Sequence, residues 1–156
     1  MVEITLQPHE IATAAWVGVR RHIASKQRGL RDKHGFTGDG YGIHVEGAGG
    51  EMAAAKALNM YWDGSVNVFK RPDLTGIQVR TRSSHDYELI VRHDDNPDDT
   101  FVLVTGQMPN YRVHGWVRGR DAMQKALLKT HGNRPAAYFV PQFMLHPIDH
   151  MLAMAG

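Results

Sequence analysis

The sequence predicts an α/β fold in which a single central mixed β-sheet is flanked by helices. Two observations support this class. The first third of the chain repeats apolar residues at helical spacing, and from residue 66 onward the chain has short β-branched or aromatic runs separated by turn residues. Helices placed before and after a run of strands are typical of one sheet covered by helices. With 156 residues and no recognisable linker or repeat, we expect a single domain spanning residues 1–156.

Two helices are expected in the first part of the chain. Pro8 can occupy the first position of a helix over residues 8–27. We expect its buried face to consist of Ala12, Trp16, Val19 and Ile23, which recur at helical spacing. Residues 29–42 are rich in glycine and predict a loop, and residues 49–62 predict a second helix.

Six strands and a third helix are expected in the remainder. The apolar runs place the strands at residues 66–69, 76–82, 87–92, 100–105, 111–117 and 137–140. The third helix is expected from Asp121, a suitable N-cap residue, to about Thr130, with Gly132 closing its end.

The composition is that of a globular protein, and its uneven charge distribution makes nucleic acid a candidate partner. The chain is 42% hydrophobic and 22% charged, and it has no cysteine, which excludes disulfides and thiolate chemistry. There is no run of about 20 apolar residues and no signal-peptide pattern at the N-terminus, so we expect a cytoplasmic protein without a membrane partner.

The net charge is only +2, but basic residues concentrate in segments 16–35 and 112–134. They indicate a phosphate-binding surface, or alternatively two solvated faces, and the candidate nucleic-acid-binding residues are Arg20, Arg21, Arg82, Arg118 and Arg120.

Four residues form a candidate metal site. Glu51 falls on the apolar face of the second predicted helix, where a carboxylate needs a partner such as a metal ion, unless it only complements the helix dipole. In the strand 76–82, alternation places Gln78 and Arg80 on one face, and Asp73 precedes the strand by a short turn. Oxygen atoms of the acids and of Gln78 would suit Mg²⁺ or Mn²⁺, while Arg80 would stabilise developing negative charge. The alternative is an edge strand protected by its arginines, with Asp73 as a turn residue.

These residues resemble the PD-(D/E)XK nuclease signature, in which a helix glutamate precedes an aspartate at a strand start and an acid-x-lysine run. The resemblance covers about residues 47–117, including the helix sequence EGAGGEMAAAKAL. It implies a restriction-endonuclease-like core and a Mg²⁺-dependent DNA phosphodiesterase with Glu51 and Asp73 as metal ligands. The chain has Gln78 where the family has an acid and Arg80 where it has lysine, and arginine cannot act as a base. The chain also resembles small bacteriophage and prophage proteins.

Two hypotheses about function therefore follow from the sequence. The first is a Mg²⁺-dependent nuclease of phage or prophage origin that acts on DNA, with Glu51, Asp73, Gln78 and Arg80 as its site. The alternative is a nucleic-acid-binding or phage accessory protein on the same fold that needs no metal. His44 and His85 border the proposed site and are the histidines of interest, His85 as a proton relay or phosphate contact. The oligomeric state is left open, a homodimer included.

Overall fold

The structure is a computed structural model that describes residues 1–27, 40–65, 76–149 and 151. The strand expected at residues 66–69 and the candidate ligand Asp73 lie outside the described residues.

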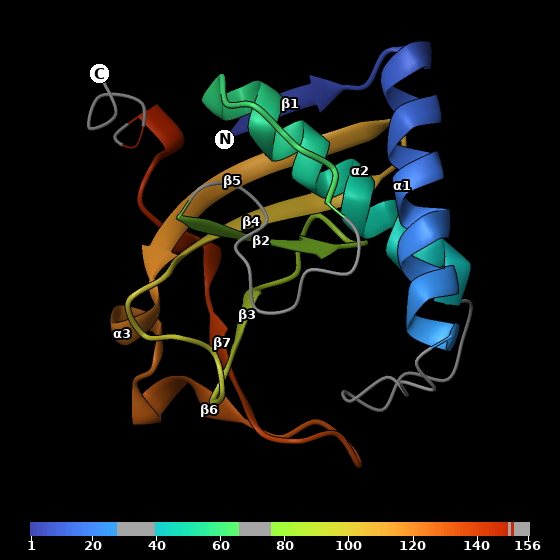
Figure 1. Ribbon diagram of the computed structural model, residues 1–156. Helices are drawn as coiled ribbons and strands as arrows, with labels where there is room; N and C mark the ends of the chain where they lie inside the picture. Colours follow the sequence, from blue (N-terminus) through green and yellow to red (C-terminus); the bar gives the residue numbers. More distant parts are fainter. Residues whose placement is uncertain (28–39, 66–75, 150, 152–156) are drawn as a thin grey trace.

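The larger of two sheets has four strands in the order β1-β5-β4-β2. They are β1 (Val2–Thr5), β2 (Ile77–Arg82), β4 (Thr100–Gln107) and β5 (Asn110–Arg118). β2 runs parallel to β4, whereas β4–β5 and β5–β1 are antiparallel, so the sheet is mixed as the sequence predicted (Figure 1). β1 was not predicted.

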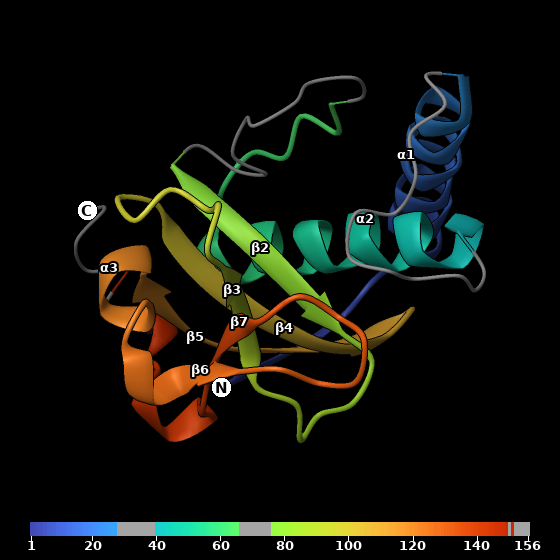
Figure 2. The same ribbon diagram turned by 90° about the horizontal axis from the view of Figure 1, so that it is seen from below.

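The smaller sheet has three strands in the order β3-β7-β6 and packs against one face of the larger sheet (Figure 2). Its strands are β3 (Leu89–Arg92), β6 (Leu128–Lys129) and β7 (Ala137–Val140). The predicted mixed α/β class is confirmed, but the strands divide between two sheets and do not form one. The side chains of β4 alternate between its two faces and so contribute to two layers. Phe101 and Leu103 pack toward the smaller sheet, and Val102 and Val104 pack toward the helices.

The helical layer consists of α1 (Pro8–Gln27) and α2 (Gly40–Leu58), and α2 covers the other face of the larger sheet. α2 begins earlier and ends sooner than the predicted 49–62. Its glycines permit close packing, because a Cβ at Gly49 would overlap the Tyr111 hydroxyl and one at Gly50 would overlap Thr81. None of the described helices is long and apolar enough to span a membrane.

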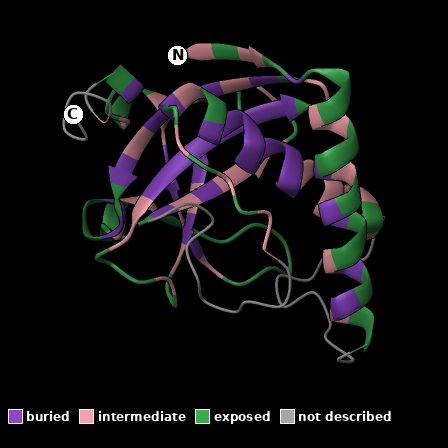
Figure 3. Ribbon diagram, turned by 45° about the horizontal axis from the view of Figure 1, so that its top comes forward, coloured by how far each residue is buried: buried purple, intermediate pink, exposed green. Residues whose placement is uncertain are grey.

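The predicted buried face of α1 is wrong. Trp16, Val19 and Ile23 are exposed, and the helix buries Ala14, Val17 and Gly18 against α2 (Figure 3). Small residues are needed there because the two helix backbones lie so close that a Cβ at Gly18 would collide with the backbone of Val45. The buried face of α1 is therefore the one whose small residues allow the two helix backbones to lie close together, and not the one with the largest apolar side chains.

The third predicted helix is also wrong. Residues 121–130 contain the end of a one-turn helix, α3 (Gly119–Ala122), a 3₁₀ turn, η1 (Lys125–Leu127), and β6. Leu128 pairs with Tyr138 of β7, so strand pairing replaces the helix that the local sequence favours. Gly132 adopts a positive φ of 56° in the β6–β7 loop, and a second 3₁₀ turn, η2 (Gln142–Met144), follows β7.

Candidate functional site

Glu51 lies on α2 and is buried against α1, where its carboxylate is fully engaged. Arg21 of α1 donates to both oxygens, from Nη1 to Oε1 at 2.7 Å and from Nη2 to Oε2 at 3.0 Å. Trp62 Nε1 donates to Oε2 at 2.8 Å, and Arg21 Nε also donates to the carbonyl of Ser65. The cation that a buried carboxylate requires is therefore supplied by Arg21.

Gln78 and Arg80 lie on the opposite face of β2 from α2. The α2-facing side of this strand consists of Ile77 and Val79, which belong to the core beneath α2. Gln78 Nε2 donates to Asp99 Oδ2 at 3.3 Å, and Arg80 pairs with Asp95 at 2.8 Å.

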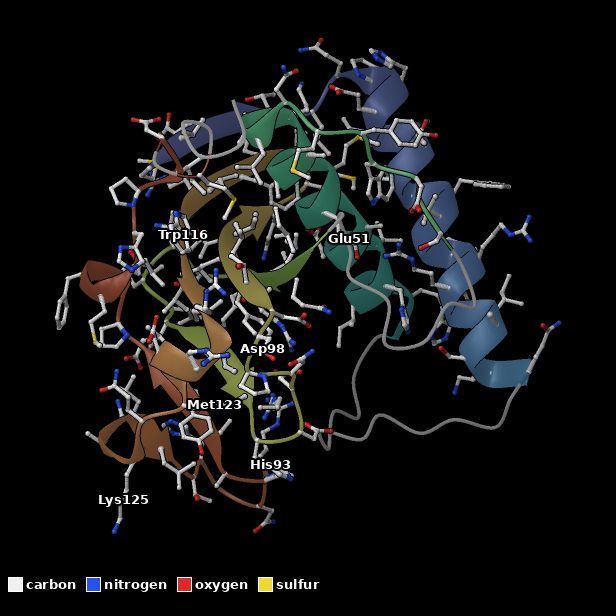
Figure 4. The ribbon with its side chains drawn as sticks, turned by 60° about the vertical axis from the view of Figure 1, so that its left-hand side comes forward. Glu51, His93, Asp98, Trp116, Met123 and Lys125 are labelled. Carbon is white, nitrogen blue, oxygen red and sulfur yellow. The ribbon has the colours of Figure 1, made fainter. Side chains whose placement is uncertain are left out.

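Glu51 and Gln78 therefore do not share a site that fits one divalent ion. Figure 4 shows Glu51 on α2 near α1, and Asp98 on the loop before β4 in a different part of the view. Among the described residues, no three His, Asp or Glu side chains gather as a metal site. Because Asp73 lies outside those residues, the four-residue site as a whole stays a prediction.

The predicted nucleic-acid-binding arginines are dispersed. Arg20 is exposed on α1 and lies over the ring of Trp16, at 4.9 Å from its centroid. Arg118 is exposed at the end of β5, and Arg120 pairs with Asp98. Arg82 lines a cavity together with further arginines.

That cavity has a volume of about 300 Å³ and lies between the β2–β3 connection and the β6–β7 loop. In Figure 2 the β2–β3 connection and the β6–β7 loop lie next to each other, near the arrowhead of β2. We call it the arginine pocket, after the three guanidinium groups that line it together with an imidazole and two aromatic rings: Arg82, Arg92, Arg134, His131, Tyr87 and Phe139. Sequence analysis missed Arg92 and Arg134, since they are far from Arg82 along the chain.

The three arginines of the pocket have different partners. Arg82 donates to the carbonyl of Glu88 at 3.0 Å, and its guanidinium lies 4.3 Å from the centroid of the Tyr87 ring. In the described part of the chain, neither Arg92 nor Arg134 forms an ion pair with a carboxylate.

The arginines of the pocket also repel one another. Burial lowers the pKa of Arg92, and Arg134 and Arg80 lower it further, against the opposing effects of Asp95 and Asp94. Burial also lowers the pKa of Arg82, and Arg134 and Arg92 lower it further, while Tyr87 and Glu88 act in the opposite direction. All of these groups stay protonated at neutral pH, so the pocket holds positive charge that an anion would neutralise.

A pair of histidines joined by a threonine borders the same sheet face. Thr105 of β4 is opposite Arg82 in the parallel register, and both side chains share a face. The Thr105 hydroxyl is hydrogen-bonded to Nδ1 of His85 at 2.7 Å and to Nε2 of His114 at 2.6 Å. Burial, followed by the nearby His85, lowers the pKa of His114 to about 4. The hydroxyl donates to one ring and accepts from the other, so the network fixes the two tautomers relative to each other.

The other candidate histidine, His44, lies on α2, and its ring centroid is 5.3 Å from that of His22. It is on the helical side of the sheet, apart from the arginine pocket. Of the two candidate histidines, His85 is the one that lies on the same face of the sheet as Arg82.

No protein-family model, curated protein or solved structure matches this chain.

Proposed function

We propose that the protein binds nucleic acid, with DNA as the first candidate, through the arginine pocket. The observation that carries the proposal is the convergence of Arg82, Arg92 and Arg134 on one cavity, two of them without an ion-pair partner among the described residues. Guanidinium groups bind phosphate oxygens through paired N–H donors and keep their charge at all physiological pH values. Phosphates of a nucleic acid supply the anions that such a pocket requires.

The nuclease-like core, the cellular location and the origin of the protein are proposed from the sequence. The resemblance to PD-(D/E)XK nucleases implies a restriction-endonuclease-like core, and the mixed sheet with α2 on one face supports that arrangement. A cytoplasmic location and a phage or prophage origin stay predictions.

Fluorescence anisotropy with labelled single-stranded and duplex DNA tests the binding. We expect the Arg92→Gln/Arg134→Gln double variant to bind at least about a hundredfold more weakly, since it loses two charge-assisted contacts of about 1.5 kcal/mol or more each. Lys56→Gln is the control, because Lys56 is exposed on α2, on the other side of the larger sheet, and is not one of the candidate nucleic-acid-binding residues. Equal binding by the double variant and the wild-type protein would refute the proposal.

Mg²⁺-dependent cleavage of DNA is the second candidate function. It is favoured by one observation: Glu51 is a buried carboxylate on the helix where the resemblance implies a metal ligand. Arg21 already neutralises this carboxylate, so we derive no catalytic step through a metal. Supercoiled plasmid incubated with Mg²⁺, Mn²⁺ or EDTA decides the question. Intact plasmid under all three conditions, at protein concentrations that bind DNA, would leave binding as the function.

A further inference from the structure

The arginine pocket carries more positive charge than one backbone phosphate would neutralise. Two carboxylates, Asp86 and Glu88, also line it, but Glu88 is directed in part to Lys129, with 3.6 Å between Oε1 and Nζ. Three guanidinium groups and the Lys129 ammonium stand against these two acids, so the pocket together with Lys129 holds a net charge of +2. A phosphodiester contributes one negative charge, whereas a phosphomonoester carries about 1.5 to 2 at pH 7 and has three terminal oxygens to accept hydrogen bonds.

We infer that the arginine pocket binds a phosphomonoester, namely the terminal phosphate of a nucleic acid strand. This inference rests on the proposed function and assigns the pocket to a strand end. Arg92 and Arg134 would donate to the phosphate oxygens, since both guanidinium groups lack a carboxylate partner in the described part of the chain. Strong, charge-assisted contacts of this kind are typical where Arg recognises phosphate.

The size of the cavity supports a strand end over a continuous strand. About 300 Å³ lies at the lower limit for pockets that hold small molecules, so there is room for a phosphate and an attached sugar. Arg82 is positioned beforehand by its bond to the Glu88 carbonyl and by the Tyr87 ring, which reduces the entropy lost when the ligand binds. The loop that contains Tyr87 is itself held by Gln142, whose Nε2 donates to the carbonyls of His85 and Tyr87.

The test uses one oligonucleotide sequence in three forms: with a 5′-phosphate, with a 3′-phosphate and with two hydroxyl ends. We expect one phosphorylated form to bind at least about tenfold more tightly than the hydroxyl form, and inorganic phosphate to compete for the difference. Arg134→Gln should remove this preference. Arg134 is exposed, so the variant should fold, and an unchanged melting temperature verifies that it does.

The outcomes separate this inference from the proposed function. If the three forms bind equally and Arg134→Gln weakens all of them, the protein binds nucleic acid and the inference about strand ends is wrong. If no oligonucleotide binds but calorimetry detects inorganic phosphate or adenosine monophosphate, with loss in Arg134→Gln, the phosphomonoester site stands and the proposed function falls. If neither oligonucleotides nor phosphate bind, both are wrong.

Discussion

The ion pair between Arg21 and Glu51 gives the sharpest prediction about stability. Arg21→Ala leaves the Glu51 carboxylate buried with only Trp62 as a side-chain donor among the described residues. Removing one partner of a buried pair costs about 3–5 kcal/mol. The Arg21 side chain is 20% exposed and that of Glu51 is 9% exposed, so water reaches the site. We therefore expect the free energy of unfolding to fall by less than this range, by about 2–3 kcal/mol. For a chain of this size, that loss lowers the melting temperature by about 4–12 °C.

Urea unfolding followed by circular dichroism measures this loss directly. Arg20→Ala is the control, because Arg20 is the neighbouring residue of α1 but is exposed. The double variant Arg21→Met/Glu51→Met should recover most of the stability, since it leaves no buried charge. An Arg21→Ala variant within about 0.5 kcal/mol of the control would refute the reasoning that Glu51 depends on Arg21. Addition of Mg²⁺ to Arg21→Ala also tests the metal prediction, because a Glu51 that binds Mg²⁺ would regain stability.

Three further predictions concern other parts of the fold. Gly50→Ala should destabilise the protein by about 1–3 kcal/mol in urea unfolding, because its Cβ would overlap Thr81, whereas Gly47→Ala meets nothing within 4 Å and should be neutral or stabilising. His114, with a pKa lowered to about 4 from 6.5, should stay neutral in NMR titrations down to about pH 5. Since the unfolded chain binds this proton first, its contribution to stability is fully present above pH 6.5 and is lost as the pH falls toward 4, and a flat stability profile there would contradict the shift. If plasmid cleavage is observed, Asp73→Asn should abolish it, and retained cleavage would remove that aspartate from the site.

The strands were predictable because their alternation is local. In β2 the apolar residues Ile77 and Val79 alternate with polar ones, and the structure buries the first set and not the second. β1 was missed because its four residues are too few for a pattern to emerge before α1 begins. The exposed face of α1 and the absence of a helix over 121–130 depend on tertiary contacts: the approach of Val45 to Gly18, and the pairing of β6 with β7.

The candidate site was only partly predictable for the same reason. That Glu51 is buried on a helix followed from helical spacing, and the structure confirms its burial. Its partner Arg21 comes from another helix, and helical spacing within α2 cannot reveal a contact between two helices. Arg82 was singled out from its strand, but the pocket also needs Arg92 and Arg134, which only the packing of the two sheets brings to it.

The salt dependence of DNA binding is the most direct test of the arginine pocket. For duplex DNA, the logarithm of the binding constant falls with the logarithm of salt concentration by about 0.9 for each phosphate neutralised. We expect Arg92→Gln/Arg134→Gln to reduce this slope by about 2, with the slope of Lys56→Gln unchanged. An unchanged slope in the double variant would contradict the claim that these arginines contact phosphate.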